Sequence, residues 1–291
     1  NIIYIIIYYI ILLLFVIYNK KRYACYILIL ITIIKIIPFL DNNFYVYYLD
    51  VNQGDSILLI SQNQKNITLI DTGGVYGKNI SDNTITFLKS RGIHKINNIV
   101  ITHGDFDHMG DAYNLVNNFK VKNVFFNCGP YNELEKKLIS NLNNKKINYF
   151  SCLKSLKINK YDLVFLQTKT FDNENDNSNV IYININKYKF LFMGDAGVKK
   201  ENEIIKNYNI QNIDFLKVGH HGSSTSSSSK FINTIKPKYS VISVGKNNRY
   251  GHPKNAVLNI LKNSKIYRTD LDGSIEVKIN RISYKIKKYN Q

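Results

Sequence analysis

The chain has 291 residues, 45% of them hydrophobic, which is enough to bury the core of one large domain or two small ones. Its 39 basic and 21 acidic residues give a formal charge of +18, which favours anionic partners such as nucleic acid or phospholipid headgroups. A general excess of Ile, Asn, Lys and Tyr also raises the lysine count without any binding purpose. The three cysteines, Cys25, Cys128 and Cys152, have no paired spacing, so we expect neither a disulfide framework nor a cysteine metal site.

Two apolar segments begin the chain. Residues 2–18 are nearly all Ile, Leu, Tyr, Phe or Val, and a helix rising about 1.5 Å per residue would carry them across most of a roughly 30 Å hydrocarbon layer. Residues 23–40 form a second apolar run with few interruptions. We therefore expect two membrane helices in residues 1–40, and the missing initiator Met suggests that they end a larger membrane region. A secretory signal does not fit, because no basic segment precedes the first run, and a buried core hairpin is the alternative.

The basic loop at residues 19–22 predicts how these helices are oriented. If this short loop is cytoplasmic, the second helix carries everything after residue 40 to the opposite side of the membrane. Lys35, near the far end of the second segment, favours the reverse orientation. We expect a multi-pass protein of the cell membrane whose second domain, residues 43–291, lies on the extracytoplasmic face.

From residue 43 onward, strand and helix patterns alternate without a repeat of fixed period. Strands are expected at residues 44–50, 56–61, 67–71, 98–101, 121–126, 163–167, 180–186, 189–193, 213–218, 239–244, 266–269, 273–279 and 282–287. Helices are expected at residues 81–91, 109–119, 131–142, 198–208, 227–235 and 255–262. Many short strands with few helices, and polar motifs at strand ends, indicate an α/β fold of two sheets between helices, with the site on the loops at one edge.

Four potential metal ligands lie close together directly after the expected strand at residues 98–101. They are His103, Asp105, Asp107 and His108. A strand end followed by a loop can direct the first two side chains at one ion and the last two at a second, as a two-metal hydrolase requires. The alternative is a polar turn that caps the next helix.

Three further strand ends carry polar motifs. Asp195 ends an apolar run and can bridge two cations, or cap the following helix. The pair His220 and His221 follows the strand at residues 213–218, and one ring could bind a metal while the other donates to substrate. Asp71 ends an earlier strand, where it fits a turn or a residue that orients a ligand better than it fits a ligand.

Taken together, six motifs resemble the metallo-β-lactamase fold and, in their order and spacing, the C-terminal domain of the ComEC family. They lie at residues 50–56, 71–73, 102–110, 194–196, 217–223 and 250–253. The resemblance covers about residues 45–275 and implies an αββα four-layer sandwich that holds two divalent ions, zinc or manganese. ComEC proteins are multi-pass membrane channels that take up DNA in natural transformation, and their hydrolase domain is thought to degrade the strand that is not imported.

The resemblance also implies roles for individual residues. His103 and Asp105 would bind one metal and Asp107 and His108 the other, with Asp195 as the bridge and His220, nearer the strand end than His221, completing the set. The expected catalytic residues are Asp107 and His221. The residues expected to contact substrate are Ser223, Ser224, Thr225, Lys217 and Arg249. The residues expected to support the ligands from behind are Asp71 and His252.

This sequence departs from the family pattern at several positions. Asp105 stands where many members of the wider fold have His, and no His lies between His108 and His220, so manganese becomes plausible beside zinc. Asn52 and Asp111 each replace a glycine, and Asp111 adds a carboxylate near the metals.

The expected activity is phosphodiester hydrolysis of DNA, single-stranded by preference, in contact with the membrane and with other competence proteins. Two alternatives remain. One is a hydrolase of the same fold that acts on a small phosphoester or other ester, and the other is a catalytically silent DNA-binding domain of a channel.

Overall fold

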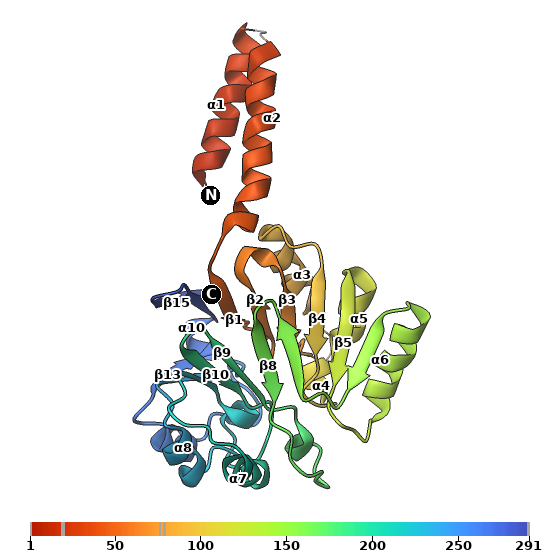
Figure 1. Cartoon of the computed structure of the whole chain (residues 1–291), viewed down its shortest axis with the longest axis vertical. Helices are drawn as coiled ribbons and strands as arrows, with labels where there is room; N and C mark the ends of the chain where they lie inside the picture. The colour runs from red at the N-terminus through yellow and green to blue at the C-terminus, as the bar shows by residue number, and fades with distance from the viewer. Residues whose placement is uncertain (1, 19–20, 76, 78–79, 290–291) are drawn as a thin grey trace.

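The computed structural model describes residues 2–18, 21–75, 77 and 80–289 and contains two mixed β-sheets (Figure 1). The first sheet has the strand order β15-β14-β1-β2-β3-β4-β5-β6. Its strands are β1 (Phe44–Tyr48), β2 (Ile57–Ile60), β3 (Ile67–Ile70), β4 (Ile96–Val100), β5 (Val121–Phe126), β6 (Asn148–Ser151), β14 (Ser274–Ile279) and β15 (Tyr284–Tyr289). The second sheet has the order β13-β12-β11-β10-β9-β8-β7. Its strands are β7 (Ser155–Ile158), β8 (Tyr161–Phe165), β9 (Ile181–Ile185), β10 (Tyr188–Phe192), β11 (Phe215–Lys217), β12 (Tyr239–Ile242) and β13 (Lys265–Arg268).

Helices cover the outer face of each sheet, which gives four layers and confirms the expected α/β sandwich. The helices against the first sheet are α3 (Ser81–Ser90), α4 (Phe106–Met109), α5 (Ala112–Asn118) and α6 (Glu133–Asn144). The helices against the second sheet are α7 (Val198–Asn207), α8 (Ser229–Ile235) and α9 (Asn255–Ile260). A short α10 (Thr269–Asp272) joins β13 to β14.

Three apolar cores hold the layers together, because the central strands are buried on both faces. Along β2, Ile57 and Leu59 pack between the sheets, while Leu58 and Ile60 pack toward the helices. This alternation follows the two-residue period of a strand. The strand is therefore apolar throughout, as expected for a strand covered on both sides.

The strand directions bring the polar motifs to one edge of the sandwich. In the first sheet β3 and β4 are parallel, and in the second sheet β10, β11 and β12 are parallel. The carboxyl ends of parallel strands meet at the same edge, so the loops after these five strands lie together. Within three residues of these strand ends lie Asp71, His103, Asp195, His220 and Ser243.

Some elements differ from those expected. The strands β6 and β7 were not expected; β6 is exposed at all four residues and β7 buries only Ile158, so neither has the apolar run or alternation that marks a strand. The expected helix at residues 109–119 corresponds to α5, which begins only at Ala112, and a separate short helix that was not expected, α4, lies within the metal-ligand segment.

A helical hairpin of α1 (Ile2–Tyr18) and α2 (Lys21–Ile36) projects from one end of the sandwich, and a short 3-10 turn (Ile37–Leu40) connects it to β1 (Figure 1). Within the described residues, no helix has the length and apolarity needed to cross a membrane. The expectation of two membrane helices is therefore corrected. Helices of 17 and 16 residues rise about 24 to 26 Å, less than the roughly 30 Å of the hydrocarbon layer.

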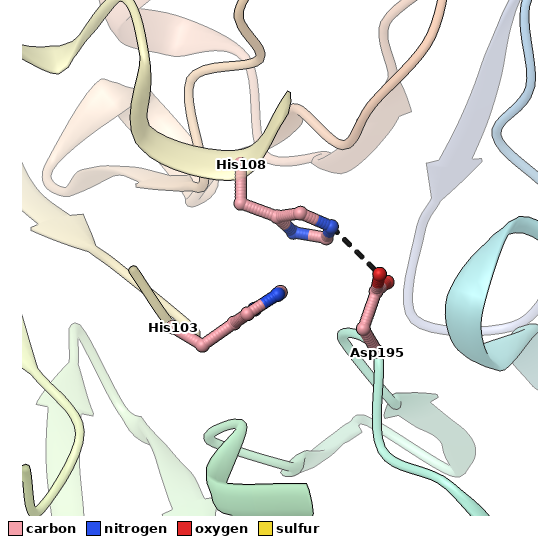
Figure 2. Close-up of side chains that lie close together, drawn as sticks. All are labelled: His103, His108 and Asp195. Atoms are coloured by element: carbon pink, nitrogen blue, oxygen red, sulfur yellow. Dashed lines mark ion pairs between the residues drawn. The ribbon is translucent and has the colours of Figure 1, made fainter. Parts of the chain in front are cut away.

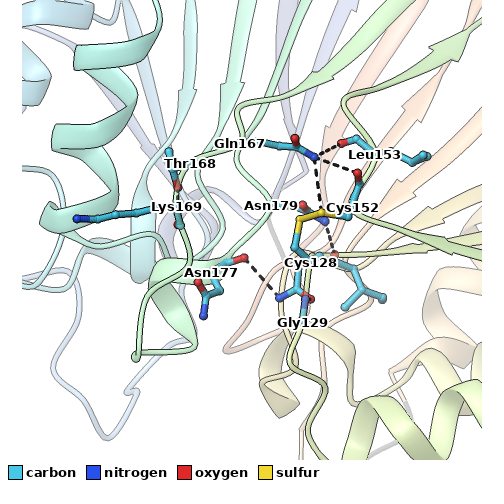
Figure 3. Close-up of a disulfide and its surroundings, with 11 residues drawn as sticks. Cys128, Gly129, Cys152, Leu153, Gln167, Thr168, Lys169, Asn177 and Asn179 are labelled. Carbon is cyan, nitrogen blue, oxygen red and sulfur yellow. Dashed lines mark hydrogen bonds between the residues drawn. A yellow bond between two sulfur atoms is a disulfide. The ribbon is translucent and has the colours of Figure 1, made fainter.

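Cys128 and Cys152 form a disulfide, which corrects the expectation that the cysteines do not pair (Figure 3). The two cysteines are 24 residues apart in sequence. However, Cys128 follows β5 and Cys152 follows β6, and these strands are parallel neighbours, so their carboxyl ends bring the side chains together. Gln167 donates hydrogen bonds to the carbonyl groups of Cys152 and Leu153 and so ties the disulfide to the segment after β8.

Breaking this disulfide is expected to lower the free energy of unfolding. In Cys152→Ser, the loss should be about 3 kcal/mol, because the bridge closes a loop in the unfolded chain. Urea unfolding of the full chain measures it. Cys25→Ser is the matched control, since the Cys25 thiol is free and exposed. Equal unfolding midpoints for the two variants would show that the bridge contributes nothing to stability.

Candidate metal centre

The loop after β4 positions the first four candidate ligands. They are His103, Asp105, Asp107 and His108. Asp105 is the N-cap residue of α4, and the His108 N–H donates to its carbonyl at 3.1 Å. Glu174 accepts from the Gly104 N–H at 3.0 Å and from Asn132 at 2.9 Å, and Asn132 donates to the Gly104 carbonyl. A Cβ at Gly104 would collide with both side chains, so this tight clamp requires glycine.

One group of potential ligands consists of His103, His108 and Asp195 (Figure 2). The two imidazole rings come from the loop after β4 and lie with centroids 4.2 Å apart. Asp195, from the loop after β10, brings its Oδ1 to 3.1 Å from His108 Nε2 without hydrogen-bond geometry. Both rings are fully buried, so these groups face one another out of contact with water.

A second group consists of Asp107, His108 and His221. His221 Nε2 lies 3.3 Å from Asp107 Oδ2 and 3.6 Å from Asp195 Oδ1. His108 is therefore common to both groups, and Asp195 lies between them. This arrangement brings side chains from the ends of β4, β10 and β11 to one point.

Residues behind the imidazoles fix which ring nitrogen faces the site. His108 Nδ1 lies 2.8 Å from Asp71 Oδ2, and Asp71 also accepts from the Thr102 N–H and hydroxyl at 2.8 and 2.7 Å. His221 Nδ1 donates to the Ser243 carbonyl at 2.8 Å. Since a carboxylate and a carbonyl only accept, both rings carry their proton on Nδ1 and present a bare Nε2 to the centre. Thr102 was not singled out from the sequence.

The structure separates the roles of the two consecutive histidines. His221 is buried and belongs to the second group, whereas the His220 side chain is 27% exposed at the rim, with Nδ1 3.0 Å from the Thr225 hydroxyl. His220 Nε2 still lies 3.6 Å from Asp195 Oδ2. The sequence favoured His220 as the ligand because it is nearer the strand end. Both residues have left-handed backbone angles, φ 47° and 52°, and this turn directs the second ring inward.

The two acidic residues of the loop differ in exposure. The Asp105 side chain is 43% exposed, with Oδ2 3.4 Å from His103 Nε2, so it lies beside the first group without belonging to it. The Asp107 side chain is 28% exposed at the mouth of the site. Burial opposes ionisation of Asp107, but the neighbouring His221 and His108 rings hold its pKa below the usual range. Burial likewise opposes ionisation of Asp195, and the neighbouring His108 and His221 rings keep its pKa well below normal.

Lys217 is not exposed, as a residue that contacts DNA would have to be. Its side chain is fully buried and its ammonium pairs with Asp55, which is also buried. Asp55 Oδ1 lies 3.6 Å from His221 Nδ1, so the pair packs directly behind the second group. Asp55, Asp71 and His108 also lie close enough together to hold a cation, but the Lys217 ammonium already occupies this place beside Asp55. The sequence indicated Asp55 only as a member of the motif at residues 50–56 and predicted no role for it.

The serine-rich segment forms an ordered loop beside His220. Ser224 and Thr225 are exposed, whereas Ser223 is buried and its hydroxyl lies 3.0 Å from the Thr225 hydroxyl. Glu201 accepts the backbone N–H groups of Ser227 and Ser228 and so fixes the end of the loop. The exposed hydroxyls therefore lie at the rim on a fixed backbone.

The remaining residues singled out from the sequence occupy the rim and the surroundings. His252 packs edge-on to His220 with centroids 5.9 Å apart, and burial together with the charge of His221 lowers its pKa to about 4. Arg249 lies on the loop after β12, next to the exposed Tyr250. Asp111 accepts from the Ser81 N–H at 2.6 Å, so this carboxylate supports the start of α3. Asn52 has φ 64°, which asparagine tolerates in place of glycine.

Unpaired buried atoms test whether this site suits a metal. Among the described residues, four buried atoms of the centre have no hydrogen-bond partner. They are His103 Nε2, His108 Nε2, His221 Nε2 and Asp195 Oδ1. Buried polar atoms without partners are costly and rare. Imidazole nitrogens and carboxylate oxygens are ligands of zinc and manganese, so a bound cation fits this donor set.

Comparisons with known proteins agree with this description. A family model described as the metallo-beta-lactamase superfamily matches residues 49–124. ComE operon protein 3 of Bacillus subtilis is 30% identical over 271 residues, which cover 85% of this chain and 34% of that protein. Competence protein ComA of Neisseria gonorrhoeae is 28% identical over 247 residues, covering 83% and 33%, respectively. Recombination protein 2 of Haemophilus influenzae is 28% identical over 238 residues, covering 79% and 28%. The chain thus spans about a third of the length of the curated relatives it matches.

Solved structures are similar in fold. The metallo-beta-lactamase fold protein YhfI from Bacillus subtilis superposes with a TM-score of 0.57 at 10% identity, covering 81% of this chain and all of that one. The diiron β-hydroxylase CmlA from Streptomyces venezuelae gives a TM-score of 0.55 at 12% identity, covering 82% of this chain and 54% of that one. At such identities the likeness concerns the fold alone.

Proposed function

The chain carries a metallo-β-lactamase domain homologous to the competence proteins ComE operon protein 3, ComA and Recombination protein 2, and from this premise we propose that it is a metal-dependent hydrolase of DNA phosphodiesters. One observation carries the proposal. Three buried imidazoles and two carboxylates from three separate strand ends converge with unpaired ligand atoms. The DNA substrate rests on the relatives, which are named as competence and recombination proteins.

The proposed ligands divide into two sets that share Asp195. One set is His103, Asp105 and Asp195, and the other is Asp107, His108 and His221 together with the same Asp195. Two divalent ions, zinc or manganese, would polarise a phosphoryl oxygen and lower the pKa of water when bound. Relative to the sequence-based expectation, His221 takes the ligand role and His220 moves to the rim.

The chain's own groups would position the substrate. The Asp107 carboxylate at the mouth is placed to orient an attacking water, because it is ionised and partly exposed. His220 and Thr225 are hydrogen-bonded to each other at the rim, and with the exposed Ser224 they can hold phosphate oxygens. Asp71 acts through His108, and the Ser243 carbonyl acts through His221, by fixing the orientation of the imidazoles.

The domain is proposed to work on the extracytoplasmic face of a cell membrane, where it would meet single-stranded DNA and other competence proteins. The disulfide between Cys128 and Cys152 supports this location, because such bonds persist in oxidising compartments and are rare in the cytosol. The competence relatives support the setting of DNA uptake.

Cleavage of a fluorescently labelled single-stranded oligonucleotide by the full chain tests the proposal. We expect cleavage with manganese or zinc, none after chelation, and none in Asp107→Asn, which keeps the side-chain size but removes the charge. Hydrolysis of a small phosphodiester without cleavage of DNA would instead identify a small-ester hydrolase. DNA binding that is equally strong with and without metal, and without cleavage, would identify a silent binding domain.

A further inference from the structure

A pocket of about 490 Å³ opens beside the metal centre. Among the described residues that line it are Asp105, Phe106, Asp107, Arg249 and Tyr250. The volume lies in the range of small-molecule sites. Because Asp105 and Asp107 also face the candidate ligands, the pocket is continuous with the site where a scissile phosphate would bind.

Aromatic residues line this pocket from both halves of the sandwich. Phe106 begins α4 in the first half, and Tyr250 lies on the loop after β12 in the second. Tyr250 is a large aromatic residue, and it is 45% exposed. Its ring stacks on His252 at 5.7 Å and 21°, and His252 in turn contacts His220. The Tyr250 ring is therefore held in a fixed place relative to the metal centre.

The charged groups decide which part of a ligand enters. Asp105 and Asp107 repel a phosphate unless cations lie between, so a phosphate belongs at the metal centre and an uncharged ring in the pocket. The Arg249 guanidinium lies 4.8 Å from the Tyr250 ring centroid and donates to its hydroxyl at 2.6 Å. A guanidinium over an aromatic ring offers both a stacking plane and a cation for a neighbouring phosphate.

From this geometry we infer that the pocket binds the nucleobase next to the scissile phosphate, stacked against the Tyr250 and Arg249 wall. The inference rests on the proposed DNA hydrolysis and adds the place where a base of the substrate binds. A base must leave its stacked neighbours to enter the pocket, and this costs least in single-stranded DNA. Stacking accepts any base, so cleavage is independent of sequence.

Two substitutions of Tyr250 test the inference in the full chain. Tyr250→Ala should lower kcat/KM for a single-stranded oligonucleotide by about tenfold, because the base loses the aromatic ring on which it stacks. Tyr250→Phe should stay close to wild type, since it keeps the ring. Methyl 2,2,2-trifluoroethyl phosphate, a diester with neither a base nor any other aromatic ring, should be hydrolysed equally by all three proteins. The matched control is Tyr149→Ala, which removes an exposed tyrosine of the edge strand β6.

A second substrate separates this inference from the proposed function. An oligonucleotide of abasic residues should be cleaved about tenfold more slowly than normal DNA by wild type, and equally slowly by Tyr250→Ala. If Tyr250→Ala slows the base-free diester as much as DNA, the ring has a structural role and the inference is wrong. If the protein cleaves no DNA at all, the proposed function fails. In that case, fluorescence anisotropy tests the pocket by itself. The inference requires that wild type bind normal DNA more tightly than abasic DNA and that Tyr250→Ala bind the two equally.

Discussion

Replacing Asp195 with asparagine is expected to abolish tight metal binding and to lower hydrolysis by more than about 100-fold. Groups that merely support metal ligands already contribute about 10–100-fold to affinity or activity, and Asp195 lies between both candidate groups. Asparagine keeps the shape of the side chain but lacks the negative charge that offsets two cations. Its amide also places a donor among imidazoles that present bare nitrogen atoms.

Metal titration by calorimetry and cleavage of labelled DNA measure the two effects separately. Asp162→Asn is the matched control, because Asp162 is an exposed carboxylate on β8. The control should bind metal and cleave DNA like wild type. If Asp195→Asn bound two equivalents of metal with unchanged affinity, the convergence of these side chains would not form a metal centre.

Replacing Lys217 with methionine is expected to lower the free energy of unfolding by about 3–5 kcal/mol, as measured for one partner of a buried ion pair. Lys217 is fully buried and pairs with Asp55, which is 2% exposed. Removing the ammonium leaves the Asp55 carboxylate buried beside His221 and His108 without its compensating charge. The loss arises mainly from this uncompensated charge, because methionine nearly matches the apolar part of lysine.

A double substitution distinguishes this cause from poor packing. Lys217→Met combined with Asp55→Leu removes both charges and should recover most of the lost stability, since buried pairs can be replaced by apolar residues at little cost. Lys230→Met, at an exposed lysine of α8, should change unfolding by less than about 0.5 kcal/mol. Urea unfolding of metal-free protein measures all four chains. A double variant no more stable than Lys217→Met would contradict the charge argument.

The metal-ligand segment shows how far local sequence can lead. His103, Asp107 and His108 are close in sequence and follow one strand, so any fold that ends the strand there keeps them together. Asp195 and the histidine pair also mark strand ends, and parallel strands bring their ends to one edge. The two-sheet fold and most of the candidate centre could therefore be predicted from apolar patterns and strand-end motifs.

Other residues were placed by contacts that no local pattern encodes. Lys217 precedes the histidine pair and reads as a surface cation, yet β11 is a central strand and turns its side chain inward. Which of His220 and His221 points into the candidate centre depends on the left-handed turn after this strand. The apolar segments at the start of the chain do form helices. Within the described residues, neither helix has the length and apolarity needed to cross a membrane.

Apolar periodicity and neighbouring ligands act over a few residues, so most of the strands and helices, and the chemistry of their ends, follow from local sequence. Which distant side chains meet depends instead on the three-dimensional packing. The order of strands in each sheet joins Cys128 to Cys152, pairs Lys217 with Asp55 and brings Tyr250 and Phe106 to one pocket. These contacts depend on the packing of segments far apart in the chain, and that packing minimises the free energy of the whole fold.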